Sequence, residues 1–168
     1  ATKTAFRAFL DYYSSLCAFK YITAIPYTVY GGKPTIKRLM DYIMESLDAP
    51  EPVNMTAGEQ ILDFIHVNDV SSFFIHVIKN FEKYLNLNNG EEFYLGTGYG
   101  HTIREVASLI EEETGKSCNI NWGGLPYRKR DTMHAIAPIA RNLELSGWHT
   151  YIKINDGIKT YIKTYYHE

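Results

Sequence analysis

The sequence is short of the features that mark secreted, membrane-spanning and nucleic-acid-binding proteins. It has two cysteines, Cys17 and Cys118, at a spacing that fits no metal site. It contains neither a signal-peptide pattern nor a run of about 18 apolar residues. These absences predict a reducing, cytoplasmic setting without a membrane segment. The net charge of −2 gives no overall attraction to nucleic acid or to anionic membranes.

What the chain does contain is typical of a folded globular protein. Hydrophobic residues make up 45% and charged residues 21%, and no repeat, low-complexity tract or linker interrupts the 168 residues. Fourteen tyrosines raise the aromatic content to 14%. Tyrosine combines apolar area with a hydroxyl, which suits clefts that hold polar ligands, although most of these rings are expected in the core or on the surface.

Strand-like and helix-like patterns alternate along the chain, which predicts the α/β fold class. Predicted strands cover residues 21–25, 53–55, 61–67, 92–95 and 117–122. Predicted helices cover the first residues to 16, 36–47, 70–78, 103–114, a short segment ending near 148, and 156–166. The predicted buried faces are Ile36, Leu39, Met40, Ile43 and Leu47 in the second helix, and Val70, Phe73, Phe74, Val77 and Ile78 in the third, which Asn68 or Asp69 caps.

The chain opens inside a predicted helix. Apolar side chains recur there at steps of three and four residues, at Phe6, Phe9, Leu10, Tyr13 and Leu16. A domain seldom begins in mid-helix without a cap, and residue 1 is Ala rather than Met. We therefore expect the chain to be the later part of a longer protein, with residues 21–25 beside strands that lie outside it.

The stretch EEFYLGTGYGHTIREVASLIEEETG, residues 91–115, places three glycines between a predicted strand and a predicted helix. A dinucleotide-binding turn has the spacing G-x-G-x-x-G, but Gly100 comes one residue early and His101 takes its place. The acidic residue expected about 20 positions on is also missing. Thr102 and Glu105 form a capping box, and Gly115 ends the helix. We interpret the stretch as a connection into a well-capped helix rather than as a cofactor site.

A candidate binding edge follows the strand at residues 21–25. Pro26 ends this strand, and Tyr27, Thr28 and Tyr30 come next, before Gly31-Gly32. In open α/β sheets, ligands bind outside the carboxyl ends of the strands. The residues alone fit this interpretation and an ordinary strand-to-loop turn equally well.

Two titratable residues in DFIHVND, His66 and Asp69, also invite a metal or acid–base interpretation. Two such side chains do not make a metal site, which needs further ligands. We expect structural roles for both and predict no metal.

Six segments occur in an order and spacing that resemble a known family: ATK, IPYTVYGG, ILDFIHVNDV, FYLGTGYGHTIREVA, LPYRKRD and LELSGW. The family is that of the nucleotide-sugar epimerases, dehydratases and reductases, the NAD-dependent epimerase/dehydratase group of extended short-chain dehydrogenases. The resemblance covers nearly the whole chain but only the later half of such an enzyme. It implies the C-terminal portion of a Rossmann-type dinucleotide-binding domain plus the smaller α/β substrate domain. Residues 1–35 would end the first, and 36–168 would mainly form the second, with 62–100 returning in part to the first.

The resemblance implies a catalytic role for Lys3. In the family, a catalytic Tyr lies four residues before a Lys on one helix, so the Tyr would lie two places before Ala1. A phenol has a pKa near 10, and a nearby cation favours phenolate, which can move a proton at neutral pH. Lys3 would also hydrogen-bond the ribose of NAD or NADP, and the cofactor would lie near Pro26, Tyr27 and Thr28.

The resemblance also implies residues for the substrate. The family's R-x-x-D pattern falls on Arg128 and Asp131, where the Arg binds the diphosphate and the Asp the nucleoside ribose. Arg suits this task because its planar fork matches phosphate oxygens. The remaining substrate positions are Thr28 and, around the base, Arg38, Leu39, Val53, Asn54 and Met55.

Three positions depart from the family pattern. Ile25 stands where many relatives have Arg, Thr28 where Asn is common, and Leu62 where an Arg binds the diphosphate. The substrate phosphates would then depend more on Arg128, with help from Lys33, Lys37 or Arg38. The departures put the usual mode of substrate binding in doubt.

Two function classes fit the residues and the resemblance. The first is a nicotinamide-dependent enzyme on a nucleotide-linked sugar, with a lean towards CDP- or dTDP-deoxysugars for surface polysaccharide. It would form a homodimer through helices of its dinucleotide domain. The second is a non-catalytic relative that binds a nucleotide sugar or dinucleotide for sensing or assembly. In either case the isolated chain, which has no Tyr-x-x-x-Lys motif, is expected to be inactive.

Overall fold

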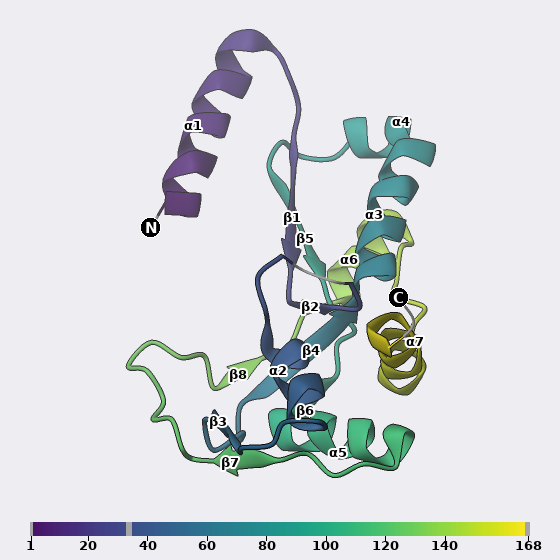
Figure 1. Cartoon of the computed structure of the whole chain (residues 1–168). Helices are drawn as coiled ribbons and strands as arrows, with labels where there is room; N and C mark the ends of the chain where they lie inside the picture. Colours follow the sequence, from purple (N-terminus) through teal and green to yellow (C-terminus); the bar gives the residue numbers. More distant parts are fainter. Residues whose placement is uncertain (1, 33–34, 167–168) are drawn as a thin grey trace.

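A computed structural model describes residues 2–32 and 35–166, and these residues form the predicted α/β fold (Figure 1). The helices are α1 (Thr2–Cys17), α2 (Leu39–Ser46), α3 (Val67–Lys79), α4 (Phe81–Leu85), α5 (Ile103–Thr114), α6 (Ala140–Ser146) and α7 (Ile154–Tyr166). The strands are β1 (Ile22–Pro26), β2 (Thr28–Tyr30), β3 (Val53–Met55), β4 (Ile61–His66), β5 (Glu91–Leu95), β6 (Gly100–Thr102), β7 (Ile120–Trp122) and β8 (His134–Ala135).

The strands pair in three small groups, with β4 at the centre of the largest. β4 pairs in parallel with β2 and β8 and antiparallel with β6, and β3 pairs in parallel with β7. β1 pairs in parallel with β5, from Ile22 opposite Glu91 to Pro26 opposite Leu95. Within the described residues β1 has no partner on its other edge. The run at residues 21–25 is therefore at the edge of the described sheet, and the neighbouring strands outside the chain remain a prediction.

Two hydrophobic clusters form the core, and β4 contributes to both because successive strand residues point to opposite faces. Phe64 belongs to the cluster that joins α2, β3, α5 and α7, whereas Ile65 belongs to the cluster under α3, β5 and α6. The first cluster contains Met40, Ile43, Met44, Met55, Val106, Ile110, Ile158 and Tyr161 among its buried members. The second contains Phe73, Tyr84, Phe93, Leu95 and Trp148.

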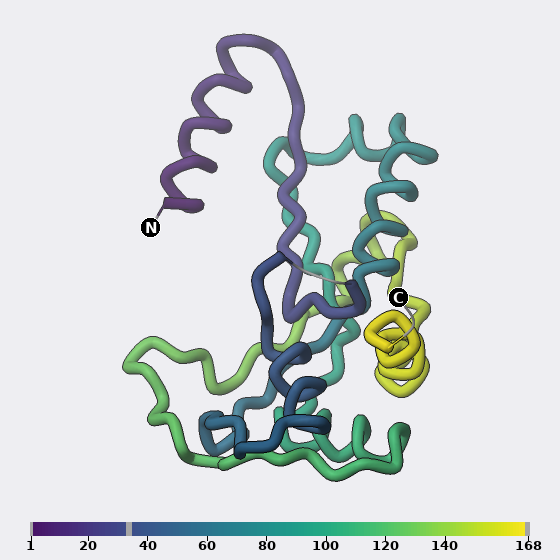
Figure 2. The backbone as a smooth tube through the Cα atoms, viewed as in Figure 1, coloured from purple at the N-terminus to yellow at the C-terminus, as the bar shows by residue number. Residues whose placement is uncertain are grey.

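Helix α1 extends away from both clusters, as the path of the backbone shows (Figure 2). Two contacts tie it to the β5 region: Asn89 Nδ2, in the turn before β5, donates to Ser14 Oγ over 2.6 Å, and Arg7 pairs with Glu92 of β5. The predicted helix is confirmed, but its apolar residues are not covered: Phe6, Phe9, Tyr13 and Leu16 are all exposed.

Helices α2 and α3 begin at other residues than predicted. α2 starts at Leu39 rather than Ile36, because the Asp41 carboxylate accepts the backbone N–H of Arg38 over 2.8 Å and fixes the first turn there. Ile36 is 79% exposed, so its predicted place on the buried face is wrong. α3 is capped by His66, whose Nδ1 accepts the N–H of Asn68, and not by Asn68 or Asp69.

The predicted buried face of α3 is correct only in part. Phe73 is buried and Val70 and Val77 pack against its cluster, but Phe74 and Ile78 are 52% and 74% exposed. The short elements β2, β6, β8 and α4 were not predicted at all.

No helix among the described residues is both long and apolar enough to cross a membrane.

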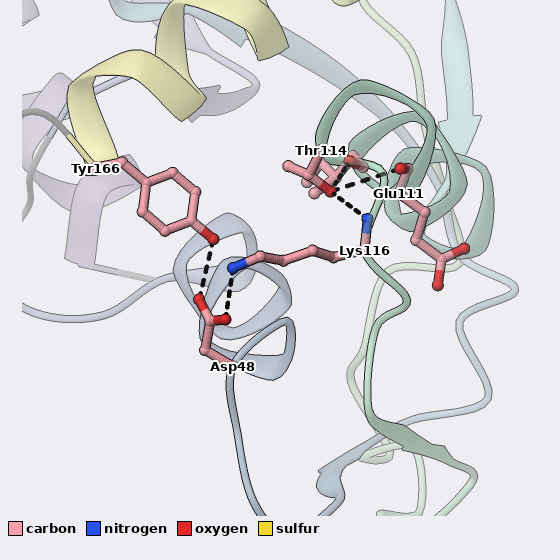
Figure 3. A network of polar contacts seen from close by, with 6 residues as sticks. Asp48, Glu111, Thr114, Lys116 and Tyr166 are labelled. Carbon is pink, nitrogen blue, oxygen red and sulfur yellow. Dashed lines mark hydrogen bonds and ion pairs between the residues drawn. The ribbon is translucent and has the colours of Figure 1, made fainter.

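The ends of α2, α5 and α7 are joined by an exposed polar network (Figure 3). Lys116 Nζ donates to Asp48 Oδ1 over 2.6 Å, and the Tyr166 hydroxyl donates to Asp48 Oδ2 over 3.1 Å. Hydrogen bonds from Lys116 and Tyr166 lower the pKa of the Asp48 carboxyl.

This network predicts a small pH dependence of stability. Because the folded-state pKa of Asp48 is lowered, the stabilisation is present above the ordinary Asp pKa of about 4 and is lost as the pH falls through the lowered value. Lys116→Met should therefore lower the melting temperature slightly near neutral pH, and the two proteins should converge in acid. A difference that persists in acid would show that Lys116 acts through packing instead. Thermal melts of both proteins across the acid range decide this.

Candidate functional site

The glycine-rich segment after β5, residues 96–100, binds a carboxylate of the protein itself through its backbone N–H groups. Asp63 on β4 is fully buried. One of its oxygens accepts the backbone N–H of Thr97 over 2.8 Å and the Thr97 hydroxyl over 2.7 Å. The other accepts the N–H groups of Gly98 and Ala137 over 2.9 and 3.1 Å. The N–H groups that a phosphate would need in such a turn thus already bind Asp63, which agrees with the interpretation of this stretch as a connection.

The helix that follows is the one predicted. Thr102 Oγ1 accepts the N–H of Glu105 over 3.1 Å, and the Glu105 carboxylate accepts the N–H of Thr102 over 2.7 Å. Gly115 ends α5 in the left-handed conformation. Gly98 has a positive φ of 80° and packs against Ile139. Gly96, Gly98 and Gly100 lie where the chain crosses closely between β5, β6 and the segment before α6, because a Cβ at any of them would collide with a side chain.

The candidate phosphate-binding loop, residues 123–133, is fixed at both ends. At its start the N–H of Leu125 donates to the carbonyl of Met55 over 3.0 Å. At its end the N–H of Ile61 donates to the carbonyl of Met133 over 2.9 Å, just before β8 pairs with β4. In the middle, the Tyr127 hydroxyl accepts the N–H of Glu59 over 3.0 Å. The loop is therefore attached to the two strands on either side of the turn at residues 56–60.

Within this loop the structure brings Arg128 and Asp131 together. The N–H of Arg128 donates to Asp131 Oδ2 over 2.8 Å, and the N–H of Asp131 donates to the carbonyl of Arg128 over 3.0 Å. Arg128 is exposed, and its guanidinium makes no hydrogen bond or ion pair with any described residue. The Asp131 side chain shapes the turn with one oxygen and keeps the other for a further donor. Lys129 and Arg130 are exposed as well.

The predicted base-binding residues of β3 divide between the core and the surface. Met55 is buried and Val53 is half-buried against the same cluster, so their side chains mainly stabilise the fold. Asn54 is exposed, and its Oδ1 accepts Asn121 Nδ2 of β7 over 2.7 Å. Asn121 thus joins Asn54 at the surface beside Gly124, where the loop begins. Asn121 was not predicted as a site residue, because only the pairing of β3 with β7 brings it beside Asn54.

A cavity of about 320 Å³ lies beside the start of α2. It is lined by Tyr30, Gly31, Gly32, Arg38, Asp41 and Tyr161, among other residues. The Tyr161 hydroxyl donates to Asp41 Oδ1 over 2.5 Å, and burial together with Asp41 raises the Tyr161 pKa. Arg38 faces this cavity, whereas Leu39 packs into the core.

Lys37, the other described cation proposed for the phosphates beside Arg38, is bonded to a carboxylate of α2. Lys37 Nζ donates to both oxygens of Glu45, over 2.8 and 2.7 Å, on the exposed side of α2. Lys33 lies outside the described residues. Leu62, at the position where the resemblance implies an Arg, is half-buried and packs against the α2–α5–α7 cluster.

The candidate cofactor edge lies at the carboxyl ends of β1 and β5. Pro26 ends β1 opposite Leu95, and the N–H of Tyr27 donates to the carbonyl of Leu95 over 3.0 Å. Tyr27 and Thr28 are half-buried, and burial followed by the charge of Asp63 raises the Tyr27 pKa. Tyr30, by contrast, is 5% exposed and belongs to the core, and it also lines the cavity beside α2.

Lys3 lies in the first turn of α1 and is exposed. Among the described residues its ammonium makes no hydrogen bond or ion pair, so the structure does not join it to Pro26, Tyr27 or Thr28. The site residues implied by the resemblance thus form three separate groups in this chain: α1, the β1–β5 edge, and the α2–β3–loop region.

His66 and Asp69 have structural roles. His66 caps α3 and is 2% exposed, and burial lowers its pKa. A Cβ at Gly31 would collide with its ring, so the turn after β2 needs glycine there. Asp69 is equally buried and accepts the N–H groups of Tyr151 and Ile152, both over 3.1 Å. The described residues contain no group of three or more side chains suited to a metal ion.

Comparisons with known proteins agree with this architecture. CDP-abequose synthase of Salmonella typhimurium is 26% identical over 165 residues, which are 96% of this chain and 54% of that protein. The same-named protein of Salmonella muenchen is 28% identical over 132 residues, 78% of this chain and 43% of that protein. The chain therefore spans about half the length of the curated relatives it matches.

Solved structures show the same fold. UDP-glucose 4-epimerase of Thermotoga maritima, solved with UDP-glucose, superposes with a TM-score of 0.80 at 23% identity, over 97% of this chain and 51% of the epimerase. The Stenotrophomonas maltophila enzyme, solved with NAD and formylated UDP-arabinopyranose, gives 0.81 at 21% identity, over 97% and 53%. The model of the NAD dependent epimerase/dehydratase family matches residues 1–95, more than half of the sequence. The chain belongs to the NAD dependent epimerase/dehydratase family.

Proposed function

We propose that this chain is the later, substrate-binding part of an enzyme that uses NAD or NADP to act on a nucleotide-linked sugar. The observation that carries the proposal is the loop at residues 123–133. It is fixed at both ends and by Tyr127, yet it holds a guanidinium, that of Arg128, which is exposed and has no partner among the described residues. An immobilised loop that carries a free planar cation is suited to a diphosphate, because less ordering is needed when the ligand binds.

In this proposal each group of residues has its own task. Arg128 binds the diphosphate, and Asp131 uses its remaining oxygen for the nucleoside ribose. Arg38, Leu39, Val53, Asn54 and Met55 surround the base, with Asn54 and Arg38 offering the exposed polar groups. Pro26, Tyr27 and Thr28 face the nicotinamide side, and Lys3 adjusts a Tyr four positions earlier on its helix. When bound, the cofactor would accept a hydride from the sugar and return it.

We also propose a division of the chain that follows the two clusters. Residues 1–35 and part of 62–100 would complete a dinucleotide domain, and the rest would form the substrate domain. The exposed apolar stripe of α1 suits pairing with a second copy, which would make the enzyme a homodimer; light scattering on the longer protein tests this. The relatives named CDP-abequose synthase favour a CDP-linked deoxysugar as the substrate class.

The Arg128 role is tested by replacing single cations. In the longer protein, Arg128→Ala should weaken binding of CDP by roughly ten- to hundredfold, since charge-assisted hydrogen bonds are the strong ones and a fork can make two. Arg128→Lys should recover only part of the loss, because an ammonium keeps the charge but not the fork. Isothermal titration with CDP, and separately with NAD, makes the measurement.

Lys129→Ala is the matched control, because Lys129 is an exposed cation on the same loop. It should change CDP affinity little, and none of the three variants should change NAD affinity. Equal and small losses for Arg128→Ala and Lys129→Ala would mean that the loop is only a basic surface. The phosphates would then be held elsewhere, with Arg38 as the first candidate.

The isolated 168-residue chain should turn over no nucleotide sugar. It contains Lys3 but no Tyr four residues before any Lys, so the proposed proton-transfer pair is incomplete within these residues. The measurement is product formation from CDP-, UDP- and dTDP-hexoses with NAD or NADP present. Steady turnover by the pure chain would place the chemistry on other residues than those proposed.

A further inference from the structure

A second cavity, of about 430 Å³, lies apart from the Arg128 loop. Its walls come from β4, from the β5–β6 connection and from the segment between α6 and α7. The Arg128 loop reaches β4 through β8, whereas this cavity borders β6, which pairs with the other edge of β4. None of the residues proposed above for cofactor or substrate lines it. The cavity is therefore a separate feature of the fold.

Two buried carboxylates hold its walls in place. Asp63 binds the N–H and the hydroxyl of Thr97, and that hydroxyl accepts the N–H of Tyr99 over 3.2 Å. Asp69, which is 2% exposed, binds the N–H groups of Tyr151 and Ile152. Both wall segments are thus fixed from behind by groups that are shielded from water. A site whose walls are already ordered loses less entropy when a ligand binds.

The side chains on these fixed walls are aromatic and cationic. Tyr99 and Tyr151 are 73% and 65% exposed, although tyrosine rings are usually covered on one face. Lys153 is exposed and His101 is half-buried. Within the described part of the chain, the phenol, ammonium and imidazole groups of these four residues have no hydrogen-bond partner. No acidic side chain is among the described residues that line the cavity, and the buried Asp63 and Asp69 are bonded to backbone N–H groups behind its walls, so Lys153 is the charged side chain of the lining.

We propose that this cavity is a second ligand site, for a small molecule that joins a planar ring to a phosphate or carboxylate group. The ring would pack against Tyr99 and Tyr151, since aromatic faces bind planar groups through stacking. The anionic group would bind Lys153, with His101 as a second polar contact. Phe64, which is buried, forms the apolar floor, and Thr150 adds a hydroxyl at the side.

Phenyl phosphate is a probe that carries both parts of this chemistry. Binding to the full chain is followed by NMR, and shifts are expected at Tyr99, His101, Tyr151 and Lys153. Benzyl alcohol, which lacks the anion, and inorganic phosphate, which lacks the ring, should each bind at least about tenfold more weakly. Lys153→Met should weaken phenyl phosphate about tenfold, and Tyr99→Ala about fivefold or more.

Two controls separate this site from the proposed substrate site. Lys163→Met removes an exposed lysine near the end of α7, the helix that begins just after Lys153, and should leave the affinity for phenyl phosphate unchanged. Arg128→Ala should also leave it unchanged, even if that variant abolishes CDP binding. The proposal is overturned if phenyl phosphate fails to saturate, if Lys153→Met and Lys163→Met behave alike, or if Arg128→Ala removes binding. The last result would assign the probe to the diphosphate site.

Discussion

Replacing Asp63 by Ala should lower the free energy of unfolding by about 3–5 kcal/mol, because three backbone N–H groups would lose their only acceptor in a buried place. The carboxylate binds the N–H groups of Thr97, Gly98 and Ala137 and the hydroxyl of Thr97. A Cβ at Gly96 would collide with the same carboxylate, so the backbone passes very close to Asp63. Urea unfolding of both proteins measures the loss.

Asp63→Asn and Asp48→Ala are the controls for this prediction. Asn keeps the volume but turns one acceptor into a donor that faces N–H groups, so it should recover little of the stability. Asp48 makes two hydrogen bonds on the surface, and removing it should cost much less than removing Asp63. Similar losses for Asp63→Ala and Asp48→Ala would mean that water replaces the Asp63 contacts.

Replacing Lys3 by Met in the longer protein should lower turnover by about two orders of magnitude or more, the scale on which general acid–base catalysis contributes. Met keeps much of the apolar stem but removes the charge that favours phenolate on the proposed Tyr. A change of one pKa unit corresponds to about 1.4 kcal/mol between protonation states. Without the cation the phenol pKa rises, so the pH at which turnover increases should move upward.

Steady-state rates across pH test this prediction, with Lys3→Arg as the control that retains a cation. Lys3→Arg should recover part of the rate and keep the pH profile closer to that of the unaltered protein. Binding of CDP should stay the same in both variants, because the Arg128 loop is a separate part of the chain. Unchanged turnover of Lys3→Met near neutral pH would place Lys3 outside the mechanism.

The elements that could be predicted from the sequence are those with local signals. α5 carries its own capping box at Thr102 and Glu105 and its own stop at Gly115, so its bounds follow from a few neighbouring residues. β1 and β4 are mainly apolar, and each is interrupted by one polar residue, Thr23 in β1 and Asp63 in β4, before its end. β2, β6 and β8 are two or three residues long and exist because β4 lies beside them, which no local pattern encodes.

Burial could be predicted less well than secondary structure. Phe74 and Ile78 fit the helical period of α3, yet they are 52% and 74% exposed. Periodicity shows which side of a helix is apolar but not what packs against it. Tyr30 follows the predicted strand and belongs to the core because β2 pairs with β4, a contact that no local pattern indicates.

In the candidate site, the contacts that could be predicted are close in sequence. Arg128 and Asp131 are three residues apart and meet in one turn. Asp63 and Asn121 could not be found this way, because their partners lie 34 to 74 and 67 residues away along the chain. Their roles appear only when β4 and β7 are placed in the fold.

The central claim is that this chain binds the sugar nucleotide in an enzyme that moves hydride to and from a nicotinamide. The most direct test mixes the longer protein, loaded with NAD or NADP, with CDP-, UDP-, GDP- and dTDP-hexoses and follows the nicotinamide absorbance during a single turnover. The account predicts reduction of the nicotinamide, or its reoxidation when the reduced form is supplied, with at least one CDP- or dTDP-linked sugar. It also predicts that Arg128→Ala needs far more sugar nucleotide for the same signal. A protein that binds the dinucleotide and the sugar nucleotide but never changes the nicotinamide spectrum would contradict the account and identify a non-catalytic binding protein.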